Sequence, residues 1–499
     1  MSTATVYLIF CVGVACLSTF SFGFHSGAIN QPRDAITVCT TPNNPDLYLK
    51  DCIDMDDWSW GIFVSIFLLG GIVGGLSGGY IGAKLGRRRA LLYNNIVYIP
   101  GTLCMVFGNT LVELSFGRFL VGVGAGTASA VVQLYVNEIS PVALRGSLGT
   151  CNQLSIVLGI AASQLIGMGM SEPGLWRGLF ACGLFAPVVQ SAMFPFCVET
   201  PKWLLSQGLG LDAKQALNRL RGMDGVDEEL TDILNVPGED TEGAPGQESS
   251  ILSEDHDDGN DADNEDNIAE PQRAIHTHPT QPMTVLSLLT TGRIRKPLLT
   301  AIGCQIAQQF SGVNGAIYYS TTIFQQSYEA QTSLILTMIM SLVNIAMTVV
   351  SLFLIERAGR KTLLIASQGG MAFCAVALVA VFNGGGGAFF VVVLLMAFVG
   401  SFAVGLGPIP WMILPELIPS YAVAPAASVC TAINWTCSFV VALVLPRAIS
   451  LAGYNIFVLF GVLLVLFAAF TAVMLVETKG RKPEAILACY QRRRRYCAL

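Results

Sequence analysis

The sequence predicts an all-α polytopic membrane protein. Of its 499 residues, 53% are hydrophobic and only 12% are charged, whereas soluble domains average about 25% charged residues. A helix needs about 20 mostly apolar residues to cross a bilayer, and twelve stretches of the chain meet this requirement. Clusters of Lys and Arg recur between them on one side only. These observations predict twelve transmembrane helices in a lipid bilayer.

The twelve predicted spans follow one another along the whole chain, with one long interruption in the middle. They cover roughly residues 6–28, 58–82, 90–110, 112–135, 148–170, 176–197, 297–324, 331–355, 363–382, 388–414, 425–447 and 454–475. The first span has no Lys or Arg before Arg33, so it lacks the basic start of a cleaved signal peptide, and its apolar run is too long for one. We therefore expect the first span to be retained.

The basic clusters indicate the orientation of the chain. Cytoplasmic loops carry an excess of Lys and Arg. With twelve spans, all the clusters fall on one face together with both termini; they are Arg87–Arg89, Arg145, Arg357–Lys361, Lys479–Lys482 and Arg492–Arg495. We expect a multi-pass protein of the plasma membrane with both termini in the cytoplasm.

Three short motifs occur twice. Gly86-Arg87-Arg88 recurs as Gly359-Arg360-Lys361, at an offset of 273 residues. The other two pairs share an offset of 278 residues: Glu138 to Pro141 recurs as Glu416 to Pro419, and Val198-Glu199-Thr200 as Val476-Glu477-Thr478. The chain is therefore predicted to consist of two six-helix pseudo-repeat bundles. Parallel repeats with a ligand site between them are typical of alternating-access transporters.

These repeats predict four segments. Residues 1–197 form an N-terminal six-helix bundle, 198–295 a cytoplasmic linker, 296–476 a C-terminal bundle and 477–499 a basic cytoplasmic tail. Within the linker, 206–235 has helical potential, whereas about 237–282 is too rich in Asp, Glu, Gly and Asn to bury a core. Residues 227–270 hold 17 of the 34 acidic residues and no Lys or Arg. We expect an acidic disordered insert and, since it lacks the EF-hand spacing, no bound metal.

Most of the fourteen cysteines lie within apolar spans, where a thiol acts as a small hydrophobic group. Cys39 and Cys52 differ, because both fall in the predicted outer loop between the first two spans. A disulfide between them is one of two possibilities that the spacing leaves open. No cysteine spacing resembles a zinc site. No nucleotide loop or catalytic constellation is present, and we expect neither enzyme activity, nor a cofactor, nor a nucleic-acid partner.

Gln308, Gln309 and Asn314 lie inside the seventh predicted span. Primary amides are costly when unpaired in hydrocarbon, so they should face protein or a water-filled cavity. An amide donates and accepts hydrogen bonds without carrying charge. A cluster of amides beside the aromatic Tyr318 and Tyr319 therefore suits a neutral polyhydroxyl ligand such as a sugar.

Together these motifs resemble the sugar porter family of the major facilitator superfamily, and in particular the animal facilitative glucose transporters. The resemblance covers almost the whole chain except the acidic insert. It is carried by seven landmarks in order: Gly86 to Arg88, Asn137 to Gly146, Glu199 to Trp203, Gln308 to Tyr319, Glu356 to Arg360, Gly407 to Trp411 and Glu477 to Arg481. The resemblance implies two six-helix bundles around a central sugar site.

The same resemblance implies which residues bind the sugar. They come from spans five, seven, eight, ten and eleven: Gln153, Gln308, Gln309, Asn314, Asn344, Trp411 and Ser438. The alternative for an intramembrane amide is that it merely joins two helices, at about 1 kcal/mol. For the adjacent Gln308 and Gln309 this is less convincing, since one helix face does not readily bury both.

Two positions depart from the family's glucose-site pattern. The glucose transporters carry a Glu where this chain has Ala403, and an Asn where it has Ser438. Loss of a charged acceptor from a buried site costs roughly 1.5–3 kcal/mol of binding if nothing replaces it. We therefore expect lower affinity or broader selectivity than in the family pattern, within the same transport class.

The resemblance also implies two gates. Tyr318 and Tyr319 would help to close the outer side, with interfacial packing as the alternative. A cytoplasmic network of charges would hold the halves together when the protein faces outward; its members would be Arg118, Glu138, Arg145, Glu199, Glu356, Arg357, Arg360, Glu416, Glu477 and Arg481. Where the C-half should carry a further Arg it has Ala424 instead, so we expect a weaker latch there.

The first span indicates how transport is driven. Proton-driven relatives carry an Asp after a Gly-Tyr pair, whereas the matching stretch here is Gly23-Phe24-His25 and the span holds no carboxylate. His25 could titrate near neutrality or serve as a wall residue. We predict facilitative uniport of a hexose, with D-glucose first, by alternating access in the lipid bilayer. The alternatives are a broad-specificity hexose or polyol carrier and a non-transporting sugar sensor. The sequence gives no information on the oligomeric state.

Overall fold

The computed structural model describes residues 5–39, 49–170, 172–222, 226–234, 287–288, 291–318, 320–325, 327–419, 421–481 and 483–491. Within these ranges the chain forms helices and no strands. The predicted acidic insert at 237–282, the basic run Arg492–Arg495 and Tyr319 lie outside the described residues.

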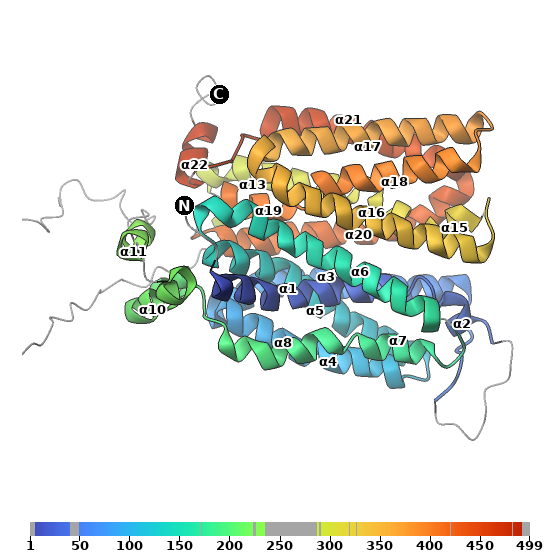
Figure 1. The fold of residues 1–499 in the computed structure, drawn as a ribbon, viewed down its shortest axis with the longest axis horizontal. Coiled ribbons are helices and arrows are strands. Elements are labelled where there is room, and N and C mark those ends of the chain that lie inside the picture. The colour runs from blue at the N-terminus through green and yellow to red at the C-terminus, as the bar shows by residue number, and fades with distance from the viewer. Residues whose placement is uncertain are drawn as a thin grey trace, which may run out of the picture.

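The N-terminal half is a bundle of long helices. Apolar residues make up most of their length, as hydrocarbon requires. Its helices are α1 (Val6–Gly27), α2 (Arg33–Thr37), α3 (Asp57–Leu85), α4 (Arg87–Phe107), α5 (Leu111–Ile139), α6 (Arg145–Met170), α7 (Trp176–Cys182) and α8 (Phe185–Met193). In Figure 1 this half, coloured blue to green, forms one layer of the molecule.

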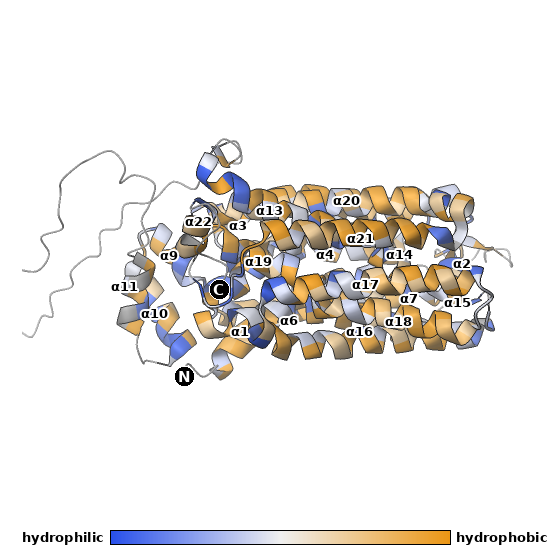
Figure 2. Ribbon diagram, turned by 90° about the horizontal axis from the view of Figure 1, so that it is seen from above, coloured by the Kyte–Doolittle hydropathy of each residue, from blue (hydrophilic) through white to orange (hydrophobic). Residues whose placement is uncertain are grey.

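The C-terminal half forms the second layer, coloured yellow to red in Figure 1. Its helices are α13 (Gly292–Gln309), α14 (Val313–Tyr318), α15 (Ser320–Gln325), α16 (Ala330–Ala358), α17 (Arg360–Asn383), α18 (Ala388–Val404), α19 (Ile409–Leu417), α20 (Val423–Ala452) and α21 (Ile456–Met474). Figure 2 shows hydrophobic residues along the length of both halves and hydrophilic residues gathered towards the ends.

Eleven helical segments within the described residues are long and apolar enough to cross a membrane. The twelfth predicted span, seventh in order, is interrupted between α13 and α14. The division falls at Phe310–Gly312, where Gly312 has φ +85°, a backbone conformation that favours glycine. The predicted multi-span helical fold is confirmed, but the seventh span is not one continuous helix.

Four short helices lie at the end of the bundle that is predicted to be cytoplasmic: α9 (Pro201–Ser206), α10 (Gly210–Arg221), α11 (Val226–Leu234) and α22 (Pro483–Gln491). The start of α1 lies at the same end (Figure 1). Helix α10 is fixed to α1 because Oγ1 of Thr5 donates to the Leu220 carbonyl at 2.8 Å. Leu217 and Leu220 are buried against the N-half. The helical potential predicted for 206–235 is thus confirmed in part of the linker.

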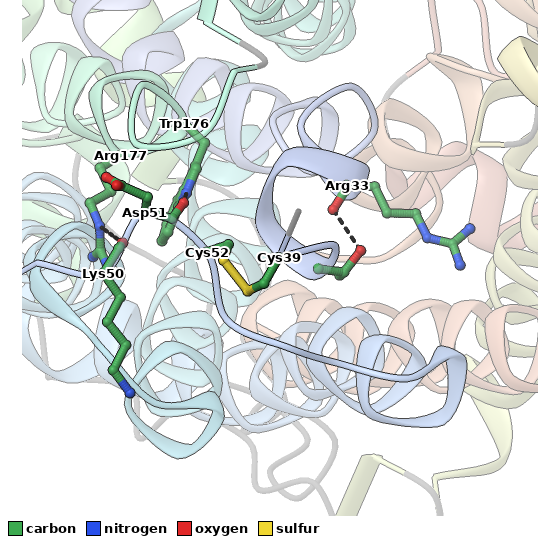
Figure 3. The surroundings of a disulfide bond; sticks show 8 residues. Arg33, Cys39, Lys50, Asp51, Cys52, Trp176 and Arg177 are labelled. Carbon is green, nitrogen blue, oxygen red and sulfur yellow. Dashed lines mark hydrogen bonds between the residues drawn. A yellow bond between two sulfur atoms is a disulfide. The ribbon is translucent and has the colours of Figure 1, made fainter. Parts of the chain in front are cut away.

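The described residues between α2 and α3 are held in two ways. Cys39 and Cys52 form a disulfide with their Cα atoms 5.4 Å apart, which decides between the two states that the spacing left open. Behind it, Nε1 of Trp176 donates to the Asp51 carbonyl at 2.7 Å, and Nη2 of Arg177 donates to the Lys50 carbonyl at 2.9 Å (Figure 3). The loop is therefore attached to α7 of the same half.

Candidate substrate site and cytoplasmic gate

Gln308 joins the two broken helices of the C-half. Its Nε2 donates to the carbonyls of Leu406 and Gly407, at 3.0 and 2.8 Å. These carbonyls lie in the break between α18 and α19, and the residue four positions after Leu406 is Pro410, which has no N–H group to donate. Irregular backbone at membrane depth persists only where other groups satisfy it. The Gln308 amide therefore stabilises the break as well as facing the predicted site.

Asn434 of α20 is the centre of an amide network. Its Nδ2 donates to Oε1 of Gln305 at 2.7 Å and to Oε1 of Gln308 at 2.9 Å, and its Oδ1 accepts from Nε2 of Gln309 at 2.9 Å. The residue is only 3% exposed. The network continues through Asn314, whose Nδ2 donates to Oε1 of Gln309 at 2.6 Å and to Oγ of Ser438 at 3.4 Å.

The structure thus brings together four of the predicted site residues: Gln308, Gln309, Asn314 and Ser438. Their hydrogen bonds run from one amide to the next, so the network is satisfied internally. A ligand must exchange these bonds for its own. Uncharged groups that both donate and accept, as sugar hydroxyls do, are the kind of ligand that can make this exchange at little cost.

Three other predicted residues lie on neighbouring helices. Gln153 of α6 faces the α18–α19 break, because a methyl group on Gly407 would lie 3.5 Å from its Nε2. Asn344 of α16 is buried, and its Oδ1 has no hydrogen-bond partner within the described part of the chain. Trp411 of α19 is partly buried, and no hydrogen bond connects it to the network in the described ranges.

Two residues of the network were missed at the level of sequence. Gln305 precedes Gln308 by three positions, which places both on one helix face, and this signal was available. Asn434 lies inside the eleventh predicted span, 425–447. A buried Asn within a span is itself a signal of a functional or structural partner.

A further amide connects the two halves. Oγ of Ser341, on α16, donates to Oε1 of Gln164, on α6, at 2.6 Å. Both side chains are buried. This bond belongs to the interface between the halves, outside the predicted residue set.

Arg118 does not belong to the cytoplasmic network, and that expectation was wrong. It lies twenty residues before Glu138 on α5, which corresponds to roughly 30 Å along a helix. It is 1% exposed, and its Nη1 donates to the His25 carbonyl at 2.8 Å. Its guanidinium also lies 4.6 Å from the centre of the Phe67 ring.

His25 is a fully buried residue of the N-half. Its Nε2 lies 3.3 Å from Oγ1 of Thr102, and its ring stacks on Tyr98 with centroids 6.1 Å apart. A charge on this ring would be placed beside Arg118. The packing therefore favours the wall-residue alternative for His25.

The three repeated motifs of the N-half meet at the end predicted to be cytoplasmic. Nη2 of Arg87 pairs with Oε1 of Glu138 at 2.9 Å. The Glu199 carboxylate accepts from the backbone N–H groups of Arg87, Arg88 and Thr200, at distances of 2.9 to 3.0 Å for Oε1. Burial raises the pKa of the Glu199 carboxyl, while the backbone hydrogen bonds act in the opposite direction.

The C-half repeats this arrangement. Nη2 of Arg360 pairs with Oε1 of Glu416 at 3.0 Å, and its Nη1 with Oε2 of Glu356 at 3.4 Å. Glu477 accepts from the backbone N–H groups of Arg360 and Lys361, at 2.9 and 3.1 Å. Gly86 and Gly359 precede the arginines with φ +94° and +85°. The internal repeat is therefore visible in local geometry as well as in sequence.

The halves touch directly at this end. A methyl group on Gly146 of α6 would overlap the Glu356 carboxylate of α16, and one on Gly79 of α3 would lie 2.5 Å from the Ala424 carbonyl of α20. Ala424 is buried in this contact. Close backbone packing thus occupies the place where the family pattern has an Arg. The contact between the halves at this end, which is predicted to be cytoplasmic, is called here the closed cytoplasmic gate.

The remaining predicted gate residues are placed as follows. Nε of Arg145 donates to the Ser140 carbonyl at 3.3 Å, within the N-half. Arg357 is exposed, and its backbone carbonyl accepts from Nζ of Lys479 at 3.0 Å. Nη1 of Arg481 donates to Sγ of Cys489 on α22 at 3.9 Å. The Tyr318 side chain, like Tyr319, lies outside the described part, so the outer gate stays a prediction.

Comparison with known proteins shows similarity to sugar transporters over nearly the whole chain. The sequence model of the family described as "Sugar (and other) transporter" matches residues 10–244 and 247–490. The chain is 34% identical to the "Solute carrier family 2, facilitated glucose transporter member 3" of Rattus norvegicus, over 98% of this chain and 94% of that protein. It is also 34% identical to the Homo sapiens protein of that name, over 98% and 93% of the two chains.

Solved structures show the same fold at lower identity. The proton:xylose symporter XylE bound to 6-bromo-6-deoxy-D-glucose matches with a TM-score of 0.78 at 20% identity, covering 98% of this chain and all of the other. The inward open conformation of XylE from E. coli matches with a TM-score of 0.66, also at 20% identity, over 97% and 99% of the two chains.

Proposed function

Because the chain belongs to the sugar transporter family, we propose that it carries a hexose across the plasma membrane by facilitated uniport, with D-glucose as the first candidate. Members of this family are multi-pass membrane proteins and transporters, not enzymes. The observation that carries the proposal is the uncharged amide network between the two broken spans of the C-half. It offers donors and acceptors at one place, faced by Gln153 of the other half.

The network suggests how a sugar is bound and released. Each amide–amide hydrogen bond replaced by an amide–hydroxyl bond is close to neutral in free energy, because the number of bonds is kept. Binding is then moderate, and release on the far side needs no further energy source. A carrier that equilibrates sugar across a membrane needs this balance.

The N-half supports uniport. Helix α1 holds no Asp or Glu, and His25 is enclosed by Tyr98, Thr102 and Arg118. A proton-coupled cycle needs a group that gains and loses a proton with access to water. Neither α1 nor the surroundings of His25 offers one.

Two positions support a broader substrate range as the second candidate. Ala403 is buried and apolar, and Ser438 reaches the network only through the 3.4 Å contact with Asn314. A smaller and less polar wall discriminates less between the hydroxyl patterns of related sugars. A broad hexose or polyol carrier is therefore the alternative to a D-glucose transporter.

The disulfide supports the location of the outer loop. Disulfides persist in oxidising environments such as the cell exterior. Helix α2, which ends two residues before Cys39, lies at the end of the molecule opposite to helices α10 and α11 (Figure 1). This arrangement fits a plasma-membrane protein whose loop between α1 and α3 faces outward.

The test uses the full chain, purified and reconstituted in liposomes. Uptake of labelled D-glucose should be saturable, should run in either direction along its gradient, and should be unaffected by a proton ionophore. Competition by a panel of hexoses and polyols ranks the substrates. Absence of flux for the whole panel would refute transport of these sugars, whereas ionophore-sensitive accumulation would refute uniport.

A further inference from the structure

A buried stack of one cation and two aromatic rings crosses between the halves. The Arg118 guanidinium of α5 lies 4.6 Å from the centre of the Phe67 ring on α3. The Phe67 ring also contacts Trp435 of α20. The two ring centres are 5.5 Å apart, and the ring planes are at 70° to each other. Arg118 and Phe67 belong to the N-half and Trp435 to the C-half. These three residues are called here the cross-half stack.

The surroundings of the stack strengthen it. Arg118 is 1% exposed, and Phe67 and Trp435 are each 3% exposed. Attraction between a cation and an aromatic face is strongest where water is excluded, and an edge-to-face ring pair is a favoured geometry. Phe22 of α1 adds a third ring against Trp435, with centroids 5.1 Å apart.

Trp435 is held by packing alone. Its Nε1–H is buried and has no hydrogen-bond partner within the residues that the structure describes. On α3, a methyl group at Gly71 would overlap the indole ring. The ring can therefore leave its place without breaking a hydrogen bond. A contact of this kind suits a part of the molecule that has two arrangements.

Helix α20 connects the stack to the amide network. Asn434 points to Gln305 and Gln308 of α13, while the next residue, Trp435, points to Phe67 of the other half. Consecutive residues on a helix point about 100° apart, so one helix reaches both neighbours. A small rotation or shift of α20 changes the amide network and the cross-half stack together.

We propose that the cross-half stack is a positioning clamp that stabilises the conformation with the closed cytoplasmic gate and links it to the amide network. Arg118 acts through Phe67, whose ring it holds against Trp435. Movement of one half relative to the other must change this contact. The clamp rests on the proposed transport function, because it couples sugar binding at the amide network to the opening and closing of the cytoplasmic gate.

The test replaces single rings and follows the gate without sugar. Phe67→Leu, Trp435→Leu and the double variant are compared in lipid nanodiscs by hydrogen–deuterium exchange of peptides containing Ser140–Gly146 and Val423–Ser428. Each single variant should speed exchange about two- to tenfold, as expected for loss of one aromatic pair. The double variant should add little, because both singles remove the same contact.

Phe63→Leu is the matched control. Phe63 lies on the same helix, is fully buried, and has its ring centre 5.4 Å from the same guanidinium, but its own ring contact is with Trp60. This variant should leave exchange at the gate unchanged. Gly71→Ala keeps all three residues of the stack and displaces the indole, so it should speed exchange and serves where a Leu variant folds poorly.

The outcomes separate the clamp from the transport function. If Phe67→Leu and Gly71→Ala leave exchange at the gate unchanged, or if Phe63→Leu speeds it equally, the clamp is refuted. That result is independent of sugar flux. Loss of all flux in the unaltered protein, measured separately in liposomes, would instead refute the proposed function.

Discussion

Nδ2 of Asn434 donates to Oε1 of Gln308 over 2.9 Å, and this bond joins α20 to α13 beside the break between α18 and α19. The same Nδ2 also serves Gln305, and Oδ1 of Asn434 accepts from Gln309. One side chain therefore satisfies three glutamines. The site depends on a residue that itself need not touch the sugar.

Asn434→Leu should abolish most transport. The variant keeps a branched side chain but removes the partner of three amide atoms. Those of Gln305 and Gln308 are buried, each at a cost of about 1–3 kcal/mol, and that of Gln309 is partly buried. We expect sugar uptake to fall at least tenfold, by roughly 1.4 kcal/mol or more in transition free energy. Initial uptake rates in liposomes measure this.

Asn383→Leu is the control for that experiment. Asn383 also donates to another Asn, Asn455, at 3.1 Å, but the pair is exposed. Its loss should leave uptake unchanged. Near-normal uptake by Asn434→Leu would show that the network does not hold the site.

Gln308 and Gln309 should differ in what their loss does. Gln308→Leu removes the donor of the Leu406 and Gly407 carbonyls, so it should lower both the thermal unfolding temperature and uptake. Gln309→Leu breaks only side-chain bonds to Asn434 and Asn314, so uptake should fall with a much smaller change in unfolding temperature. Equal destabilisation by both would contradict the assigned role of Gln308.

The long helices and the repeat could be predicted from the sequence because lipid imposes a strong pattern. Hydrocarbon requires about 20 apolar residues for each span, and the paired motifs around Arg87 and Arg360 mark corresponding helix ends. The amide network could not be predicted in full. Whether Asn434 bonds to Gln308 or to a neighbouring helix depends on tertiary packing. Tertiary packing produces no periodic pattern that could be recognised in the sequence.

One difference from the sequence-based expectation has a physical reason. Arg118 was assigned to the cytoplasmic network by family pattern, although twenty residues of helix separate it from Glu138. The weak latch expected at Ala424, where a charge is missing, stays a prediction. The structure adds a close backbone contact between Ala424 and Gly79, which only the packing of α3 on α20 reveals.

Ser438→Asn should raise the affinity for D-glucose. The longer amide reaches further into the network than the Ser438 hydroxyl, and one added hydrogen bond contributes about 0.5–1.5 kcal/mol. We expect half-saturation for glucose to fall about two- to tenfold, with a smaller change for a polyol such as sorbitol. Equal shifts for both ligands would mean that position 438 does not select among sugars.

The disulfide should be reached by reagents from outside the cell. Before reduction, a membrane-impermeant maleimide should not label Cys39 or Cys52, because they are bonded to each other. After treatment with an impermeant reductant, both should be labelled in intact cells. The Cys39→Ser, Cys52→Ser double variant controls for other thiols. Labelling only after the membrane is permeabilised would place the loop on the cytoplasmic side and contradict the prediction.

Gly146→Ala should open the cytoplasmic gate. The added methyl group would overlap the Glu356 carboxylate and lie 2.5 Å from Nη2 of Arg360. These two groups form an ion pair within the C-half, and Arg360 is held further by Glu416. These atoms are the ends of flexible side chains, so the added methyl group should displace them and weaken the contact of the Glu356–Arg360 pair with α6. The hold between α6 and α16 should loosen as a result.

Gly169→Ala gives the matched control, since Gly169 lies on the same α6 and nothing lies within 4 Å of an added methyl group there. Both variants exchange one glycine for alanine in one helix, so effects on helix propensity are shared. Gly146→Ala alone should increase labelling of a cysteine introduced on the cytoplasmic side, at Ser147, and should lower net uptake. Because a separation of the halves at this end favours the inward-facing state, equal labelling in the two variants would contradict the closed gate.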